Sequence, residues 1–334
     1  MGFERNYQVK VLTNQLLNKF YSIFPNYSKL NPWFITGFTD AEGSFIISVY
    51  RDEKSKLKWR VLAYFSIHVH EKDLPLLKLI QKTLSVGIVR KNNENTVLFR
   101  VSGIKELQII MNHFKNYPIV SAKYSDFLLF EECLELLKEK AHLTDKGLLK
   151  IISLKVNLNK GLSKELIEAF PNIKGVDRPE YKFKGIPDPT WISGFASGDS
   201  SFSVSIENGT SKLGKRVRLI NGTCLHAREK DLLIRISKYF NGLYLKSNEV
   251  NKEISVYCDK KRNTALLQIK STSDIINKVI PFFTEYPVLG IKLLDFYDFK
   301  KVAKLVKNKE HLNIDGLNKI MKIVNNMNLK RKWK

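Results

Sequence analysis

Asn31-Pro-Trp-Phe-Ile-Thr-Gly-Phe-Thr-Asp-Ala-Glu-Gly-Ser-Phe45 is the stretch of sequence that decides the fold, because it occurs a second time as Asp188-Pro-Thr-Trp-Ile-Ser-Gly-Phe-Ala-Ser-Gly-Asp-Ser-Ser-Phe202. Each copy begins with a residue that caps helix N-termini, followed by proline in the first turn. Each copy also has one carboxylate near its end, Glu42 in the first and Asp199 in the second. The sequence therefore predicts two equivalent helices, one in each half of the chain.

Three further segments repeat in the same order. His68-Val-His-Glu-Lys-Asp-Leu74 matches His226-Ala-Arg-Glu-Lys-Asp-Leu232. Tyr117-Pro-Ile-Val120, followed by Lys123, matches Tyr286-Pro-Val-Leu289, followed by Lys292. The pairs His142-Leu143 and Gly147-Leu148 match His311-Leu312 and Gly316-Leu317. Four matches in one order indicate a duplicated domain, and the wider spacing after Leu232 indicates that the second copy has gained residues before Tyr286.

Each copy has the pattern of an α+β domain: helix, two strands, helix, two strands, helix, and then closing helices. Apolar and polar residues alternate over 45–50 and 202–206 as in half-buried strands, and strands are also expected over 86–90 and 96–101. Helices are expected over 73–84, 231–240, 121–140 and 290–307. The predicted organisation is an N-terminal extension (1–30), a first domain (31–160), a linker (161–187), a second domain (188–328) and a basic tail (329–334).

The chain is strongly basic. It holds 56 Lys and Arg residues against 33 Asp and Glu residues over 334 positions, which gives a formal net charge of +23. DNA, which carries about one negative charge per 1.7 Å of helix axis, is the expected partner of such a chain. A need for solubility alone and docking on anionic lipid are the alternatives that the charge by itself leaves open.

Cysteine and histidine usage argues against other classes of site. The three cysteines, Cys133, Cys224 and Cys258, are widely spaced, which suits a reducing compartment and excludes a disulfide scaffold or a CxxC zinc motif. His68 and His70 share one face of a strand, where a polar face turned toward DNA is favoured over a metal pair. No apolar run is long enough to span a bilayer, and residues 1–27 lack a signal-peptide core, so a soluble protein with no membrane partner is expected.

Small residues follow one face of each repeated helix, which predicts that the two helices pack against each other. These residues are Thr36, Gly37, Asp40 and Ala41 in the first helix and Ser193, Gly194, Ser197 and Gly198 in the second. Packing alone does not explain an acid at the end of both helices, because a carboxylate there meets the unfavourable end of the helix dipole. A bound cation would compensate, so Glu42 and Asp199 are the candidate catalytic and metal-binding residues.

Two such carboxylates suit metal-assisted hydrolysis of phosphodiester bonds. Mg²⁺ takes its oxygen ligands from one or two carboxylates, from water and from substrate phosphate. A bound ion lowers the pKa of an attacking water and neutralises charge on the leaving oxygen. One acid in each repeat predicts one cut in each strand of double-stranded DNA.

Basic and polar residues flank the expected hairpins, where they can neutralise phosphates or read base edges. The candidates in the first copy are Tyr50, Arg51, Lys54, Lys56, Lys58, Arg60, His68, His70, Arg90 and Lys91. Those in the second copy are Lys212, Lys215, Arg216, Arg218, Lys246, Lys260, Lys261 and Arg262.

Residues 35–43 and 192–200 resemble the two LAGLIDADG motifs of single-chain homing endonucleases, and the Tyr-Pro and His-Leu segments are similar to the intron-encoded I-OnuI type over roughly residues 31–328. The resemblance implies two pseudo-symmetric αββαββα domains whose sheets form a saddle over DNA. It implies Mg²⁺ or Mn²⁺ at Glu42 and Asp199, with the backbone of Ala41 and Gly198 as further ligands. It also places basic or polar groups near the scissile phosphate at Arg100, and at Gln268 or Lys270 in the second copy.

The function implied is that of a monomeric homing endonuclease that makes a staggered double-strand break and spreads its own intron or gene. The heavy use of Asn, Lys and Ile suits an AT-rich organelle genome, so a mitochondrial location is expected. Two alternatives stay open: a maturase that binds intron RNA and assists group I splicing, and a cleavage-impaired DNA-binding relative.

Two residues depart from the motif in the second copy. Ser197 stands where Asp40 stands in the first copy, at a position expected to serve packing and capping rather than metal binding. Ser200 replaces Gly43, and a side chain there is expected to crowd the backbone, the metal or DNA. If one strand is cut poorly, the fault is expected at Asp199. Residues 1–30 have no counterpart in the resemblance.

Overall fold

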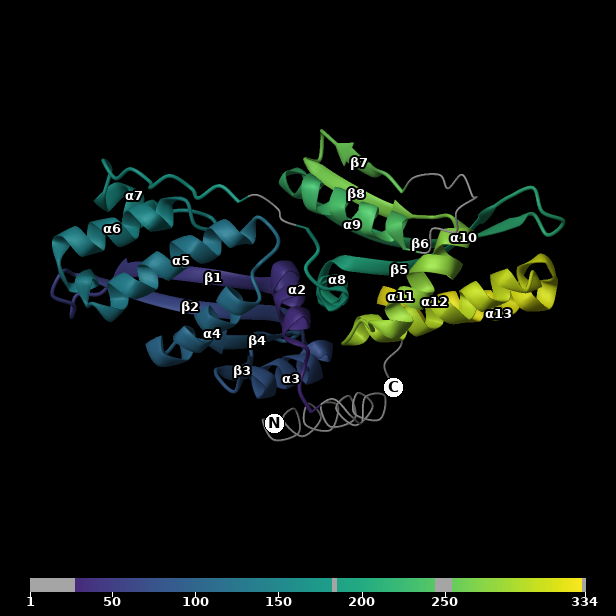
Figure 1. The fold of residues 1–334 in the computed structure, drawn as a ribbon, viewed down its shortest axis with the longest axis horizontal. Coiled ribbons are helices and arrows are strands. Elements are labelled where there is room, and N and C mark those ends of the chain that lie inside the picture. The colour runs from purple at the N-terminus through teal and green to yellow at the C-terminus, as the bar shows by residue number, and fades with distance from the viewer. Residues whose placement is uncertain (1–27, 182–184, 244–253, 332–334) are drawn as a thin grey trace. The chain divides into compact units, whose positions relative to one another are not determined.

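The chain folds into two compact units, Met1–Phe183 and Lys184–Lys334, which divide within the predicted linker. The computed structural model describes residues 28–181, 185–243 and 254–331 (Figure 1). Most of the predicted N-terminal extension, the candidate Lys246 and the end of the predicted tail lie outside the described residues. Each unit is described on its own below.

Unit 1, the first of the two, contains the predicted helix and strand series. Its elements are α2 (Pro32–Glu42), β1 (Gly43–Arg51), β2 (Trp59–His70), the 3-10 turn η1 (Glu71–Asp73), α3 (Leu74–Leu84), β3 (Ile88–Lys91), β4 (Thr96–Val101), α4 (Ile104–Asn116), α5 (Lys123–Lys138), η2 (Ala141–Leu143), α6 (Asp145–Val156) and α7 (Lys164–Ala169).

Unit 2 repeats this series through the last long helix, with a π-helical turn that interrupts the helix corresponding to α4; its described elements end in the short turn η6 and include no counterpart of α7. Its elements are α8 (Pro189–Asp199), β5 (Ser200–Asn208), β6 (Lys215–His226), η3 (Ala227–Glu229), α9 (Lys230–Gly242), β7 (Val256–Asp259), β8 (Thr264–Ile269), α10 (Thr272–Asp274), the π turn η4 (Ile275–Val279), α11 (Ile280–Glu285), α12 (Ile291–Lys307), η5 (Glu310–Leu312), α13 (Ile314–Val324) and η6 (Asn328–Lys330).

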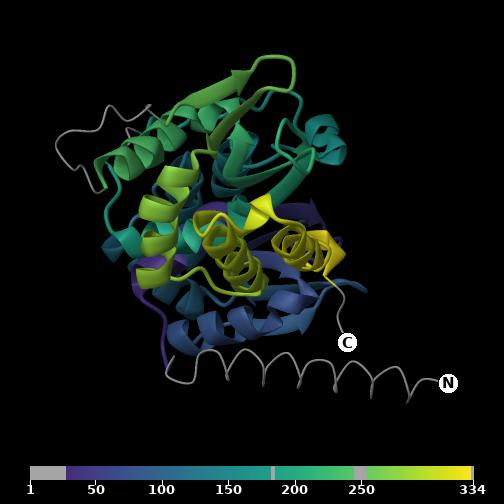
Figure 2. The same cartoon turned by 90° about the vertical axis from the view of Figure 1, so that its right-hand side faces the viewer.

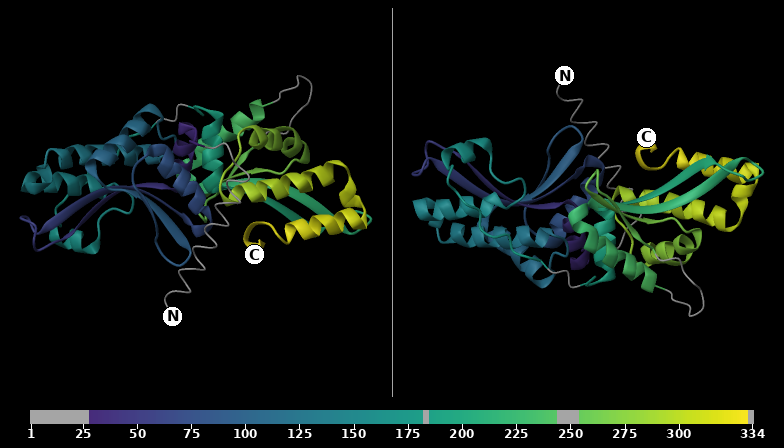
Figure 3. Two further views of the ribbon diagram at one scale, coloured as in Figure 1. Left: turned by 90° about the horizontal axis from the view of Figure 1, so that it is seen from below. Right: turned by 90° about the horizontal axis from the view of Figure 1, so that it is seen from above.

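Each unit is built on one antiparallel sheet of four strands, in the orders β1-β2-β4-β3 and β5-β6-β8-β7. The long helices of each unit lie on one face of its sheet (Figure 3). Helix α5 packs on β1 and β2 and against α6 in unit 1 (Figure 1), and α12 and α13 run side by side in unit 2 (Figure 2). The opposite side of each sheet, which we call the open face, carries the alternate residues of every strand.

An aromatic cluster fills the space between sheet and helices in both units. The Phe45 ring lies 5.3 to 5.5 Å from the rings of Phe65, Phe114, Phe127 and Phe130. In unit 2 the Phe202 ring contacts those of Phe283, Phe296 and Phe299 in the same way. Burying one such side chain contributes about 1.5–3 kcal/mol, so the phenylalanine after each repeated helix anchors the first strand to the helical layer.

The sheet register corrects one of the sequence matches. His70 pairs with Thr96 and His226 with Thr264, each at the end of its strand. Each imidazole then accepts a hydrogen bond from the backbone N–H two residues later and so caps the following 3-10 turn. His226 is therefore the counterpart of His70, not of His68. The match failed because identical Glu-Lys-Asp triplets lie at slightly different distances from the strand end in the two units.

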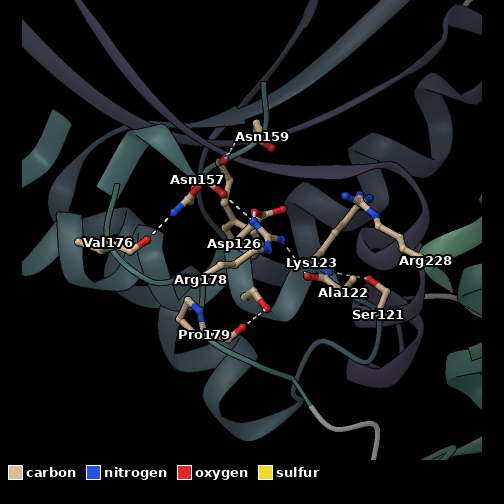
Figure 4. Close-up of polar contacts among 12 residues, drawn as sticks. Ser121, Ala122, Lys123, Asp126, Asn157, Asn159, Val176, Arg178, Pro179 and Arg228 are labelled. Atoms are coloured by element: carbon tan, nitrogen blue, oxygen red, sulfur yellow. Dashed lines mark hydrogen bonds and ion pairs between the residues drawn. The ribbon is translucent and has the colours of Figure 1, made fainter. Parts of the chain in front are cut away.

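In each unit, polar contacts join the segment beyond the last long helix to the first strand and the helical layer. We call these contacts the polar latch; they are made by Asn159 and Arg178 in unit 1 and by Asn328 and Arg331 in unit 2. Asn159 and Asn328, which both have positive φ, donate hydrogen bonds to the Phe45 and Phe202 carbonyls. Arg178 binds the Asp126 carboxylate at 2.8 Å and the Ala122 carbonyl at 3.3 Å, as Figure 4 shows. In unit 2 the guanidinium of Arg331 binds the carboxylates of Asp295 and Asp298 at 2.5 and 3.0 Å.

The latch of unit 1 ties part of the predicted linker to the helical layer. The Ser153 hydroxyl donates to the Lys174 carbonyl, the Ser125 hydroxyl donates to the Pro179 carbonyl, and the Val176 N–H donates to the Ser153 carbonyl. The segment up to Pro179 is therefore a fixed part of unit 1.

Candidate functional site

The two predicted helices begin as their sequences indicate. The Asn31 side chain accepts a hydrogen bond from the Trp33 N–H and the Asp188 side chain accepts one from the Thr190 N–H, with proline next in each case. The helices end at Glu42 and Asp199, and the first strand of each sheet begins at the next residue. Both acids are half-buried. This direct helix-to-strand junction holds each carboxylate at the start of an open sheet face.

Gly43 permits a very close approach at the junction in unit 1. A Cβ atom on Gly43 would lie 2.4 Å from Thr39 Cγ2 and 2.8 Å from the Thr39 carbonyl oxygen, well inside van der Waals contact. At the same place in unit 2, Ala196 replaces Thr39, which removes the Cγ2 atom. Ser200 is accommodated there, 8 % exposed, with its hydroxyl 2.7 Å from that of Thr223. Ala196 thus removes one steric reason for expecting Ser200 to crowd its surroundings.

A lysine that the sequence pattern had marked only as a repeat binds the end of each helix. Lys123 Nζ donates to the carbonyl oxygens of Thr39 and Ala41 at 3.2 and 2.9 Å. Lys292 Nζ donates to the Gly198 carbonyl at 2.6 Å. A cation is favourable at a helix C-terminus, where the last carbonyls lack intrahelical partners. Both lysines follow the repeated Tyr-Pro segments, so the signal was present in the sequence, but their distance from the acids along the chain hid the role.

The small-residue face is used within each unit in a way that the sequence did not reveal. The Thr36 hydroxyl donates to the Tyr117 carbonyl, and the Asp40 carboxylate accepts hydrogen bonds from the N–H groups of Val120 and Ser121. Asp40 therefore binds the backbone that precedes α5, and its expected part in packing between the two helices stays a prediction.

The equivalent serines of unit 2 make similar contacts. The Ser193 hydroxyl donates to the Pro287 carbonyl, and the Ser197 hydroxyl accepts from the Leu289 N–H at 2.9 Å. The placement of Gly37, Ala41, Gly194 and Gly198 at a helix pair concerns the two units together and stays a prediction.

Strand register decides which DNA-binding candidates lie on the open face. In unit 1 they are Tyr50, Arg60, His68, His70 and Arg90, and in unit 2 Arg216 and Arg218, because these alternate with the buried positions. Arg51, Lys91 and Lys215 have the parity of the core face and are exposed because they lie at strand ends. The remaining described candidates lie in hairpin turns: Lys54, Lys56, Lys58, Lys212, Lys260, Lys261 and Arg262.

Arg100 lies on the open face of unit 1 in the row of residues that follows Glu42. Ser44 pairs with Ser66, and Ser66 pairs with Arg100, so the arginine is two strands, or about 10 Å, from β1. Its guanidinium carbon lies 3.6 Å from the centroid of the Tyr64 ring. Arg100 Nε and Ser66 Oγ are buried and have no hydrogen-bond partner among the described residues. Burial, and next the charge of Arg100, lower the pKa of His68 in this cluster.

The corresponding row of unit 2 is less polar and carries no charge. Ser201 pairs with Gly222, and Gly222 pairs with Gln268. Register therefore makes Gln268 the counterpart of Arg100, whereas Lys270 lies beyond the end of β8. The sequence had left this choice open. The two rows differ because Ser66 and Arg100 are replaced by Gly222 and Gln268.

The donors at both helix ends fit a hard divalent cation. Each end offers a carboxylate and backbone carbonyl oxygens, and a carbonyl that accepts from lysine keeps a second lone pair. Within the described residues there is no group of three or more His, Cys, Asp or Glu side chains that could hold a metal by itself. A site of this kind depends on water and phosphate for its other ligands.

No described helix has the length and apolar character to cross a membrane.

Comparison with known proteins gives one consistent family. The family described as LAGLIDADG endonuclease matches residues 35–134 and 192–303. A probable intron-encoded endonuclease of Neurospora crassa is 34% identical over 96% of this chain, which spans 61% of that relative's length. The meganuclease I-CpaMI bound to uncleaved DNA is 46% identical, with a TM-score of 0.83, over 90% of this chain and all of that one.

The homing endonuclease I-SmaMI gives a second structural match. Bound to cleaved DNA, it is 38% identical with a TM-score of 0.86, over 91% of this chain and 99% of its own. I-SmaMI has also been solved on an uncleaved target in the presence of calcium ions. Each of the two matched ranges contains most of one repeated helix together with its acid. With the motif present in each unit on the same α+β fold, this chain belongs to the LAGLIDADG endonuclease family.

Proposed function

We propose that this protein is a site-specific homing endonuclease that makes a staggered double-strand break in a long DNA target by metal-assisted hydrolysis. The observation that carries the proposal is the repeated helix end, where a carboxylate, a lysine bound to the last carbonyls and an open sheet face come together in both units. The net charge of +23 supports a polyanionic substrate. The DNA-bound structures of I-CpaMI and I-SmaMI support double-stranded DNA in particular.

The chain's own residues divide the chemical work. Glu42 and Asp199, with the carbonyls of Ala41 and Gly198, would hold Mg²⁺ or Mn²⁺, which when bound lowers the pKa of water and neutralises charge on the leaving oxygen. Lys123 and Lys292 fix those carbonyls and add positive charge at the two helix ends. The basic residues of the open faces and hairpin turns bind the DNA backbone and read base edges. We propose that the protein acts as a monomer in mitochondria.

The Glu42→Gln variant tests the active site. The amide keeps the size of the side chain but removes the charge that holds the cation, so double-strand cleavage of a target plasmid with Mg²⁺ should be lost while DNA affinity changes little. Glu71→Gln, a change of the same kind on η1, is the matched control and should cut normally.

The DNA target for this assay is identified by incubating the unaltered protein with a randomised DNA library and selecting the sites that it cleaves. Cleavage of both strands by the Glu42→Gln variant would refute the active site. An unaltered protein that cuts no DNA but stimulates splicing of its intron would refute the endonuclease and favour the maturase.

A further inference from the structure

A cavity of about 560 Å³ opens on the helical layer of unit 2, away from the residues of the candidate active site. Its floor is apolar and is formed by Ile276, Ile280, Tyr297 and Ala303. Tyr297 is 39% exposed. Its rim holds four lysines, Lys300, Lys301, Lys304 and Lys307, which follow α12 over two helical turns. We call this feature the α12 groove.

Two differences from the equivalent helices of unit 1 help to form the groove. Ala303 stands where unit 1 has the fully buried Leu134, which removes side-chain volume from the floor. The π turn Ile275–Val279 replaces a turn of α4, which is α-helical throughout, and one groove residue, Ile276, lies in it. Such turns insert a residue into a helix and occur frequently at functional sites.

The charge is reversed relative to unit 1 at three of the four rim positions, while Lys307 corresponds to Lys138. Glu131, Glu132 and Glu135 of α5 occupy the places of Lys300, Lys301 and Lys304. The three glutamates pair with Lys115, Lys150 and Lys138 at 2.5 to 2.9 Å.

The lysines of unit 2 are less fully paired. Lys301 binds Asp298 and Lys300 binds the Thr284 hydroxyl, whereas among the described residues Lys304 and Lys307 have no ion-pair partner. The fold therefore does not require lysines at positions 300, 301 and 304, where unit 1 has glutamates.

We propose that the α12 groove binds an amphipathic helix of a partner protein, with apolar residues in the floor and acidic residues against Lys304 and Lys307. Two helical walls, an apolar floor and a charged rim are the features of helix-in-groove recognition. Charge complementarity selects the acidic helix. A nucleic acid would pair its phosphates with the lysines, but it would not bury the apolar side chains of Ile276, Ile280 and Ala303. This chain's residues 1–27 carry Arg5, Lys10 and Lys19 against a single Glu4, so their charge does not complement the rim.

Fluorescence anisotropy with the full-length protein tests the proposal. The probe is a labelled helical peptide of about 16 residues, with leucines along one face and glutamates beside them. It should bind with a Kd of about 10 μM. Ala303→Leu restores the residue of unit 1 and fills the floor, and Lys304→Glu/Lys307→Glu reverses the unpaired charges. Each variant should weaken binding by about tenfold.

The matched control is Lys238→Glu/Lys322→Glu, which makes the same change in net charge on exposed positions of α9 and α13. It should leave peptide affinity within about twofold of the original, since exposed charges contribute little at a distance. DNA cleavage should be unchanged in all variants.

Three results would overturn the proposal: no binding of the peptide, an equal loss in the control, or equal binding of a peptide with its leucines scrambled. Competition by random-sequence RNA as strong as by unlabelled peptide would also overturn it in favour of nucleic acid. If Ala303→Leu fails to fold by circular dichroism, the surface pair Lys304→Glu/Lys307→Glu and its control decide the question.

Discussion

Single residues at the helix-to-strand junction show how two copies of one motif tolerate different sequences. A Cβ atom on Gly43 would lie 2.4 Å from Thr39 Cγ2, whereas in unit 2 Ser200 follows Ala196, which lacks that atom. The sequence marked Ser200 as a departure from the motif. It did not reveal the compensating alanine one turn earlier, because a contact across a junction has no periodic signature.

Gly43→Ser should therefore destabilise unit 1, and Thr39→Ala should restore part of the loss, because it removes the 2.4 Å contact but not the 2.8 Å contact with the Thr39 carbonyl oxygen. Overpacking costs about 1–3 kcal/mol, so urea unfolding should show a loss of that size in Gly43→Ser and a partial recovery in Thr39→Ala/Gly43→Ser. Thr39→Ala alone is the control. If the changes in the free energy of unfolding caused by the two single substitutions simply add in the double variant, the two positions are not coupled.

Tyr64 is expected to position Arg100 for cleavage of one strand. A guanidinium stacked on a ring gains about 0.5–2 kcal/mol, which restricts Arg100 on the open face. Tyr64→Leu should slow cutting of the strand served by Glu42 by roughly tenfold at unchanged DNA affinity, whereas Tyr64→Phe should keep the ring and the rate.

Strand-resolved rates in single turnover measure this effect. The second strand is an internal control, since unit 2 carries Gln268 in place of Arg100. Equal slowing of both strands would indicate a general structural defect and would contradict the positioning role.

At the scale of elements, sequence patterns predicted which helices and strands exist and which strand faces are buried. Helix starts at Pro32 and Pro189 followed from local capping, and strand faces followed from alternation, because both depend on neighbouring residues. The counterpart of His226, the hydrogen bonds of Asp40 and the role of Lys123 were not predicted. Each of these depends on segments that are distant in sequence and meet only in the folded unit.

Arg178 is the element-scale link between unit 1 and the linker. Arg178→Ala leaves the buried Asp126 carboxylate without its guanidinium partner and is expected to release residues 174–181. Limited proteolysis should cut this segment at least several-fold faster, because cleavage follows the population of the open form. Lys174→Ala is the control, since only the Lys174 backbone is bound. Equal cutting of both variants would show that Arg178 does not hold the linker.

For the whole molecule, a buried histidine predicts acid sensitivity. Burial lowers the pKa of His113 to about 4 from 6.5, so between these values the unfolded chain takes up a proton that the folded chain does not. Stability should therefore fall as pH decreases from 6.5 to 4, by about 3 kcal/mol from this group. His142 and His311, whose pKa values burial also lowers, add to the same trend.

The His113→Phe variant isolates this contribution, because unit 2 has Phe282 at the equivalent place. Urea unfolding at a series of pH values should give a shallower decline for the variant than for the unaltered protein. The same decline in both would assign the acid sensitivity to other groups.

The polar latch also bears on how halves of such proteins can be exchanged. Each unit completes its helical layer with an arginine from beyond its last long helix, Arg178 in the first and Arg331 in the second. A chimera joined before Arg178 would leave Asp126 without its partner, although the helices and the sheet would be intact. A crossover placed between Pro179 and Asp188 would transfer each half together with its own latch. A boundary drawn from secondary structure alone would end the first half at α7, which ends at Ala169. For building recombinant nucleases from two parents, the functional boundary of the first half therefore lies beyond Pro179.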